Sequence, residues 1–149
     1  MIIQQFYKEH CNRQQCLESI YLFLDNINNE YNPPLSAKVD LRQYAEKIFD
    51  NAVLFIKINH SNIVGMVVLY CNDENKEKAY IPLVGVLPSH QRHGIAKELM
   101  QEAISYVKSK DFNVIGIHSN NSIAIKAYCH LGFNIIEHGE RKYMELRIK

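Results

Sequence analysis

Residues 84–96 combine small residues with cationic side chains at a predicted junction between a strand and a helix. The first turn of a helix has main-chain N–H groups without internal partners, and the aligned peptide dipoles add partial positive charge. Gly94 and Ala96 let a phosphate approach the backbone, while Arg92 and His93 add cationic or donor groups at the rim. The segment therefore predicts a diphosphate-binding site, although an ordinary helix start also explains it.

Two standard nucleotide-binding signatures are missing from the sequence. It contains neither the GxxxxGKS or GxxxxGKT pattern of P-loop proteins nor a GxGxxG pattern after a strand. It does contain the pattern Q/R-x-x-G-x-G/A, as Gln91-Arg92-His93-Gly94-Ile95-Ala96, three residues after Pro88. Residues 121–133 then match N-x-x-A-x-x-x-Y-x-x-x-G-F. The two motifs in this order resemble the GNAT N-acetyltransferase superfamily.

The resemblance implies an acetyl-CoA-dependent enzyme with a mixed α/β fold. Its sheet would be strongly bent and mostly antiparallel, with a splayed pair of parallel central strands and about four flanking helices. Acetyl-CoA would lie in the V-shaped gap, with the main chain of Val84 and Val86 bonded to the pantetheine amides. Asn121 would contact the cofactor or cap the next helix. The pyrophosphate would be held by the amides of Gln91, Arg92, His93, Gly94, Ile95 and Ala96.

Acetyl transfer to an amine needs an uncharged amine, a donor for the developing oxyanion and a proton for the leaving thiolate. An alkyl amine has a pKa of about 10 and arrives charged, whereas the thiol has a pKa of about 8.5. By the resemblance, Tyr128 is the general acid; a purely packing role between Ala124 and Gly132 also explains it. A main-chain N–H near Val84 would stabilise the oxyanion.

The general base departs from the family pattern. Many relatives carry a glutamate on the strand before the phosphate-binding turn, but residues 79–84 (AYIPLV) contain no carboxylate. His118 could accept the proton through water, with Tyr80 as a weaker candidate, although a polar strand end also explains His118. Pro82 is unusual in a central strand, and we predict that it lies at a bulge or beside the splay.

Other chemistries find less support in the sequence. There is no H-E-x-x-H motif and no Cys/His pair with zinc-finger spacing, so no metal site is predicted. There is also no GxSxG esterase motif and no basic and aromatic run typical of nucleic-acid binding. The cysteines lack CxxC spacing and are expected to be reduced thiols. They are Cys11, Cys16, Cys71 and Cys129.

The first half of the chain predicts two helices and a hairpin. Apolar residues recur at helical spacing from residues 12–28, and Asp40 is a predicted N-cap of a second helix, with Gln43 completing a capping-box pattern. Residues 52–59 and 62–70 are rich in β-formers, and the polar pair between them predicts an antiparallel hairpin.

The second half predicts a strand, helix and strand crossover, which implies two parallel neighbouring strands. A short helix closed by Gly132 and a last hairpin follow. The predicted elements are a strand at 79–87, a helix at 91–109, a strand at 112–118, a helix at 122–131 and hairpin strands at 133–138 and 142–148.

Composition limits the class of protein. The 149 residues, 47% of them hydrophobic and 22% charged, predict one globular domain over residues 1–149. The net charge of +1 favours neither nucleic acid nor membrane as a partner. No apolar run approaches the roughly 20 residues that span a bilayer, and no secretion signal is found, so a cytoplasmic protein is expected.

The sequence therefore predicts an acetyl-CoA-dependent N-acetyltransferase that acts directly on a primary amine of a small molecule, an amine or amino sugar. Two alternatives stay open, namely a protein or peptide N-acetyltransferase and a non-catalytic acyl-CoA-binding module. The missing carboxylate favours the second alternative, and Tyr128 argues against it. The acceptor is not identified by the sequence, and a homodimer also stays open.

Overall fold

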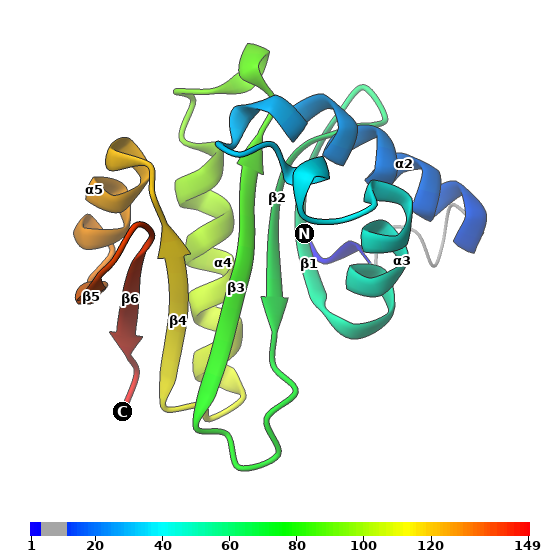
Figure 1. Ribbon diagram of the computed structural model, residues 1–149. Helices are drawn as coiled ribbons and strands as arrows, with labels where there is room; N and C mark the ends of the chain where they lie inside the picture. Colours follow the sequence, from blue (N-terminus) through cyan, green and yellow to red (C-terminus); the bar gives the residue numbers. More distant parts are fainter. Residues whose placement is uncertain (4–11) are drawn as a thin grey trace.

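A single mixed sheet organises the part of the chain that the computed structural model describes, residues 1–3 and 12–149. Its six strands have the order β1-β2-β3-β4-β6-β5 (Figure 1). The strands are β1 (Val53–Asn59), β2 (Asn62–Tyr70), β3 (Lys78–Val86), β4 (Val114–Ser119), β5 (Asn134–His138) and β6 (Lys142–Arg147). The helices are α2 (Arg13–Ile27), α3 (Leu41–Asn51), α4 (Ile95–Ser109) and α5 (Ser122–His130). Short 3₁₀ turns are η1 (Asn28–Glu30), η2 (Leu35–Ala37) and η3 (Pro88–His90).

Helices α2 and α3 cover one face of the sheet beside β1 and β2 (Figure 1). The predicted cap of α3 is confirmed, because the Asp40 side chain accepts a hydrogen bond from the Gln43 N–H at 3.0 Å. A complete capping box is found on α2, where Asn12 and Gln15 bond each other's main chain. The apolar faces of α2 and α3 form a first core cluster with β1 and β2. It includes Ile20, Phe23, Leu24, Ile48, Leu54 and Met66.

The predicted hairpin is confirmed by the antiparallel pairing of β1 with β2. The connecting residues His60 and Ser61 have φ values of 51° and 68°. Two successive left-handed residues are the geometry of a two-residue turn that matches the twist of the strands.

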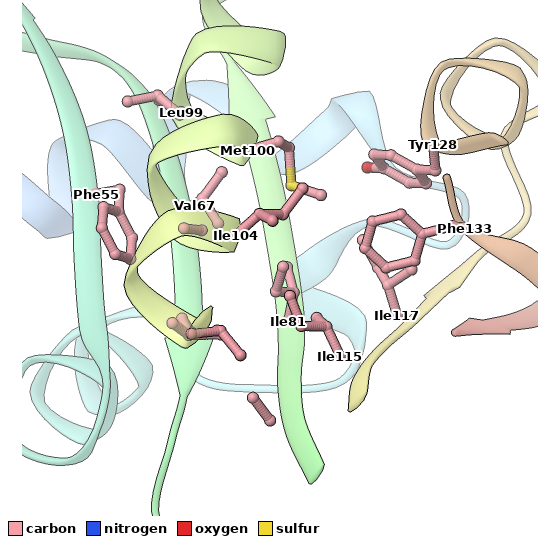
Figure 2. Close-up of a cluster of buried hydrophobic side chains, with 14 of the residues drawn as sticks. Phe55, Val67, Ile81, Leu99, Met100, Ile104, Ile115, Ile117, Tyr128 and Phe133 are labelled. Atoms are coloured by element: carbon pink, nitrogen blue, oxygen red, sulfur yellow. The ribbon is translucent and has the colours of Figure 1, made fainter. Parts of the chain in front are cut away.

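The long helix α4 packs on the opposite face of the sheet and builds the second core cluster (Figure 2). The predicted start of this helix at Gln91 is wrong, because α4 begins at Ile95. Arg92 and Gly94 have φ values of 66° and 76°, and a left-handed backbone cannot belong to a right-handed helix. The cluster around α4 includes Phe55, Val67, Ile81, Leu99, Met100, Ile104, Ile115 and Ile117.

Replacing Gly65 of β2 with alanine is expected to lower the free energy of unfolding by about 1–3 kcal/mol through overpacking. An added Cβ would lie 2.6 Å from Ile95 Cγ2 and 3.3 Å from Leu99 Cδ1, the side chains that seat α4 on β2. Urea unfolding measures the change. Gly139→Ala is the control, since its nearest contact is 3.5 Å away. Equal midpoints for the two variants would contradict the close approach of α4 to β2.

The parallel pair β3 and β4 separates partway along its length, as expected (Figure 1). The pairing runs from Lys78 opposite Val114 to Ile81 opposite Ile117 and continues no further. The next residue is Pro82, which has no N–H to donate. Between β2 and β3 the register also shifts at this point, where Val68 pairs with Leu83 but Tyr70 pairs with Tyr80. The predicted place of Pro82 beside the splay is therefore confirmed, and a register irregularity lies at the same point.

The C-terminal hairpin completes the sheet in an order that the sequence did not predict. The strands β5 and β6 pair antiparallel as expected, but β6 lies between β4 and β5. The helix α5 ends before Gly132, whose φ is 106°. The mixed, mostly antiparallel sheet with one splayed parallel pair confirms the predicted fold class.

Candidate active site

A cavity of about 500 Å³ occupies the region where β3 and β4 separate, a volume typical of small-ligand sites. Its walls come from the separated ends of the two strands, the connection between α2 and α3, the start of α5 and the turn between β5 and β6. The predicted site residues that line it are Val84, Val86, Gln91, His118, Asn121 and Tyr128.

The main chain of β3 faces this cavity at alternate residues. The Leu87 N–H donates to Val64 on β2, and in an antiparallel ladder alternate residues point to opposite sides. Val84 and Val86 therefore direct their N–H and C=O groups away from β2, toward the space left by β4. The Tyr31 hydroxyl donates to the Val84 carbonyl at 2.7 Å, and Gln91 Nε2 donates to the Val86 carbonyl at 3.2 Å. The N–H groups of Val84 and Val86 are therefore available to a ligand.

The turn before α4 has the open main chain that the sequence predicts. From Arg92 to Lys97, no main-chain N–H donates a hydrogen bond to a described residue. The left-handed backbone of Arg92 and Gly94 is typical of the concave loops that bind anions with successive N–H groups. A Cβ on Gly94 would meet nothing within 4 Å, so the space in front of the backbone is open.

Gln91 makes hydrogen bonds that the sequence does not indicate. Its N–H makes a long 3.5 Å hydrogen bond to the Pro88 carbonyl, and its side chain donates to Glu30 Oε1 at 2.8 Å. Ile95 is also anchored, because its side chain is buried in the core cluster on α4. The predicted contact of these two residues with pyrophosphate stays a prediction.

Tyr128 extends from α5 between the second core cluster and the cavity. Figure 2 shows its ring beside Phe133, with the hydroxyl at the end that faces away from α5 and toward β3. The ring centroids of Tyr128 and Phe133 are 6.1 Å apart, and the tyrosine is only 8% exposed. Burial raises the pKa of Tyr128 to about 12, so the phenol keeps its proton at neutral pH.

His118 lies on β4 next to the weaker candidate base, Tyr80 of β3. The Tyr80 oxygen is 2.6 Å from His118 Nδ1, so the structure joins the two candidates in one hydrogen bond. The centroid of the His118 ring also lies 4.7 Å from the centroid of the Tyr143 ring. Burial, and then the charges of Arg141 and Lys78, lower the pKa of His118 below its usual 6.5. The imidazole is therefore neutral at physiological pH, as a base must be.

Asn121 acts as the cap of α5, since its side chain accepts from the Ala124 N–H at 3.0 Å. It lines the cavity as well, and its contact with a cofactor stays a prediction. Tyr31, Lys38 and Arg141 also line the cavity, although sequence reasoning did not select them. Each comes from a connecting segment, and no local pattern marks such residues.

The thiols and histidines do not form a second site in the described ranges. Burial raises the pKa of Cys71 to about 11, which keeps this thiol protonated and unreactive. Cys11 lies outside the described residues. In residues 1–3 and 12–149, no three His, Cys, Asp or Glu side chains gather to hold a metal ion. Over the same residues, no helix has the length and apolar character needed to cross a membrane.

Comparison with solved structures places this architecture among acetyltransferases. The PaiA N-acetyltransferase from Thermoplasma acidophilum, in complex with coenzyme A, is 15% identical with a TM-score of 0.68, over 89% of this chain and 93% of that one. A GNAT family acetyltransferase from Elizabethkingia anophelis with acetyl-CoA bound is 20% identical with a TM-score of 0.59, over 70% and 82%. The ribosomal-protein-S18-alanine N-acetyltransferase from Escherichia coli is 16% identical with a TM-score of 0.74, over 93% and 91%.

These identities show the fold, and the family is shown by the sequence. No curated protein sequence matches the chain. Residues 21–133, however, match the family model described as the acetyltransferase (GNAT) family, and they include both motifs and every predicted site residue. The chain therefore belongs to the acetyltransferase (GNAT) family.

Proposed function

We propose that this protein transfers the acetyl group of acetyl-CoA directly to a primary amine of a small molecule. One observation carries the proposal: a single cavity is lined by the exposed main chain of β3, by Tyr128 and by His118, whose Nδ1 lies 2.6 Å from the Tyr80 oxygen. The open N–H groups before α4 lie next to the end of β3. Acetyl-CoA supplies an activated thioester, and the described residues supply binding, orientation and proton transfer.

The residues that would hold acetyl-CoA form a continuous path. The N–H groups of Val84 and Val86 face the cavity and would bond the pantetheine arm. The amides of Arg92 to Ala96 would bind the pyrophosphate, with the Arg92 and His93 side chains exposed at the rim. A main-chain N–H near Val84 would stabilise the negative charge that develops on the acetyl oxygen.

His118 is the proposed base, and Tyr80 positions it. When His118 Nδ1 carries the proton and donates to the Tyr80 oxygen, Nε2 keeps its lone pair and accepts a proton from the amine, directly or through water. Burial raises the pKa of Tyr80, with Arg141 opposing, so Tyr80 remains a neutral phenol at physiological pH. This pair takes the place of the carboxylate that β3 lacks.

Two loops around the cavity favour a small acceptor over a protein chain. The Asn120 side chain donates to the Asn32 carbonyl at 2.9 Å, which joins the end of β4 to the connection between α2 and α3. Arg141 also lines the cavity, from the turn between β5 and β6. A peptide would need an open groove through this region.

We also propose that residues 1–149 form one catalytic domain; the cytoplasmic location and a homodimer stay predictions.

The test of this function is the release of free thiol from acetyl-CoA in the presence of a panel of primary amines. The proposal expects release that depends on the amine, together with an acetylated product found by mass spectrometry. CoA binding without thiol release from any amine would instead support a non-catalytic acyl-CoA-binding protein.

The pH dependence of activity tests His118. Because burial and nearby cations lower the pKa of His118 below 6.5, the base stays neutral at pH 7 and is lost only as the pH falls below that value. We expect kcat/KM to have an acid limb below pH 6.5 in the wild type. His118→Gln should remove this limb and lower kcat/KM at pH 7 by about 100-fold, a typical contribution of general base catalysis.

His130→Gln is the matched control, because His130 is exposed at the end of α5 and does not line the cavity. This variant should retain the acid limb and the rate. An acid limb that persists unchanged in His118→Gln would assign it to another group and overturn the role of His118.

A further inference from the structure

We infer that the amine acceptor also carries an anionic group, a carboxylate or phosphate, and that Arg141 and Lys38 bind this group in the cavity. The inference rests on the proposed function, since it names the class of acceptor for the same site. It follows from the charged side chains around the cavity and from their partners.

Among the described residues, three with charged side chains line the cavity, and they differ in whether they have a partner. Glu30 is held by Gln91 at the end of the cavity toward α4, where its Oε1 accepts a hydrogen bond of 2.8 Å. Lys38 and Arg141 make no ion pair or hydrogen bond with any side chain in residues 1–3 and 12–149. The cavity lining therefore includes two cationic side chains without an ion-pair or hydrogen-bond partner among the described residues.

Arg141 also lies within electrostatic range of the proposed base. It lines the same cavity as His118; after burial, its charge is the next cause that lowers the pKa of His118, and it opposes the rise that burial causes in the pKa of Tyr80. The other charges near His118 are Lys78, which lies with Nζ 4.2 Å from the centroid of the Tyr143 ring, and Glu137, which opposes the shift. An anion bound by Arg141 would thus belong to the molecule whose amine is next to His118.

These charges select among amines. Arginine forms paired hydrogen bonds with carboxylate and phosphate, and such charge-assisted bonds are about twice as strong as neutral ones. A polyamine would instead place further positive charge beside Arg141 and Lys38, which is unfavourable. Nearby cations also lower the pKa of the acceptor amine and increase its reactive neutral fraction. An amine that also carries an anionic group therefore gains binding free energy from the two cations. The same cations still favour the uncharged form of its amino group.

The experiment compares matched pairs of acceptors that differ only in the anionic group. One pair is an L-amino acid and its carboxamide, and the other is glucosamine 6-phosphate and glucosamine. We expect kcat/KM to be at least about tenfold higher for the charged member of one pair, mainly through KM. The pair that shows the preference distinguishes a carboxylate from a phosphate.

Arg141→Gln should reduce this charged-to-uncharged ratio by about tenfold, and Lys38→Gln by a smaller factor, because Lys38 is a single point charge. Arg147→Gln is the matched control, since it removes the same charge from β6 at an exposed position outside the cavity. The ratio should not change in this control. CoA-induced thermal stabilisation confirms that each variant is folded.

The two proposals fail in different ways. If no amine in the panel supports thiol release, the proposed function fails and the acceptor class fails with it. If amines are acetylated but neither pair shows a preference for the charged member, the function stands and the anionic acceptor is excluded. A wild-type preference that Arg141→Gln and Lys38→Gln both leave unchanged would also overturn the assignment of these residues.

Discussion

Replacing Gly94 with leucine is expected to abolish the thermal stabilisation that CoA gives the protein. A ligand at a hundredfold excess over its Kd stabilises a folded protein by about 2.7 kcal/mol, which is several degrees for a domain of this size. Gly94 lies in the turn whose N–H groups lack partners, and the space in front of its backbone is open. A leucine side chain would fill the volume that the pyrophosphate needs.

The same substitution also strains the backbone, and the measurement must separate the two effects. Gly94 has a φ of 76°, where a residue with a Cβ costs about 1–2 kcal/mol. Melting without CoA measures this strain, and the additional shift with CoA measures binding. Gly139→Leu adds the same bulk to another exposed turn and should leave the CoA shift intact. An undiminished shift in Gly94→Leu would remove the phosphate-binding role of this turn.

Tyr128→Phe is expected to lower kcat by about 100-fold to 10,000-fold, the usual contribution of a positioned general acid. The ring should stay in place, because it packs beside Phe133 and phenylalanine preserves that contact. The Tyr128 hydroxyl makes no hydrogen bond with the described residues, so stability should change little. The Kd for CoA, measured by calorimetry, should remain within about threefold of wild type, a change of less than 1 kcal/mol.

Tyr106→Phe is the control, since Tyr106 lies on α4 outside the cavity lined by Tyr128. It should retain the wild-type kcat. If kcat in Tyr128→Phe equals that of the control, Tyr128 is a packing residue and another group protonates the thiolate.

The pKa of Tyr128 affects whether its phenol can protonate the leaving thiolate. Burial raises its pKa to about 12, while an exposed thiol has a pKa of about 8.5. In water that difference would make proton transfer to the thiolate unfavourable. A thiolate formed in the same cavity would lose its hydration as well, and burial raises the pKa of thiols too. The shared environment therefore brings the donor and the acceptor of the proton closer in pKa.

The sequence alone determined the features that depend on neighbours in the chain. Asp40 caps α3, and His60 and Ser61 form the hairpin turn, because caps and tight turns are set by a few consecutive residues. The two motifs identified the family for the same reason, since their small and polar residues are spaced along single segments. Pro82 indicated the place of the splay because its missing N–H is a local property.

The tertiary structure decided what depends on contacts between distant segments. Tyr80 and His118 are 38 residues apart, and only the parallel pairing of β3 with β4 places them 2.6 Å from each other. Tyr31 reaches Val84 across 53 residues, and Arg141 enters the cavity from the last hairpin because β6 pairs with β4. Side-chain periodicity predicts which face of an element is buried, but it contains no information on which elements become neighbours. The composition of the proposed acceptor site was therefore set by sheet order and register, which arise only when the whole core packs.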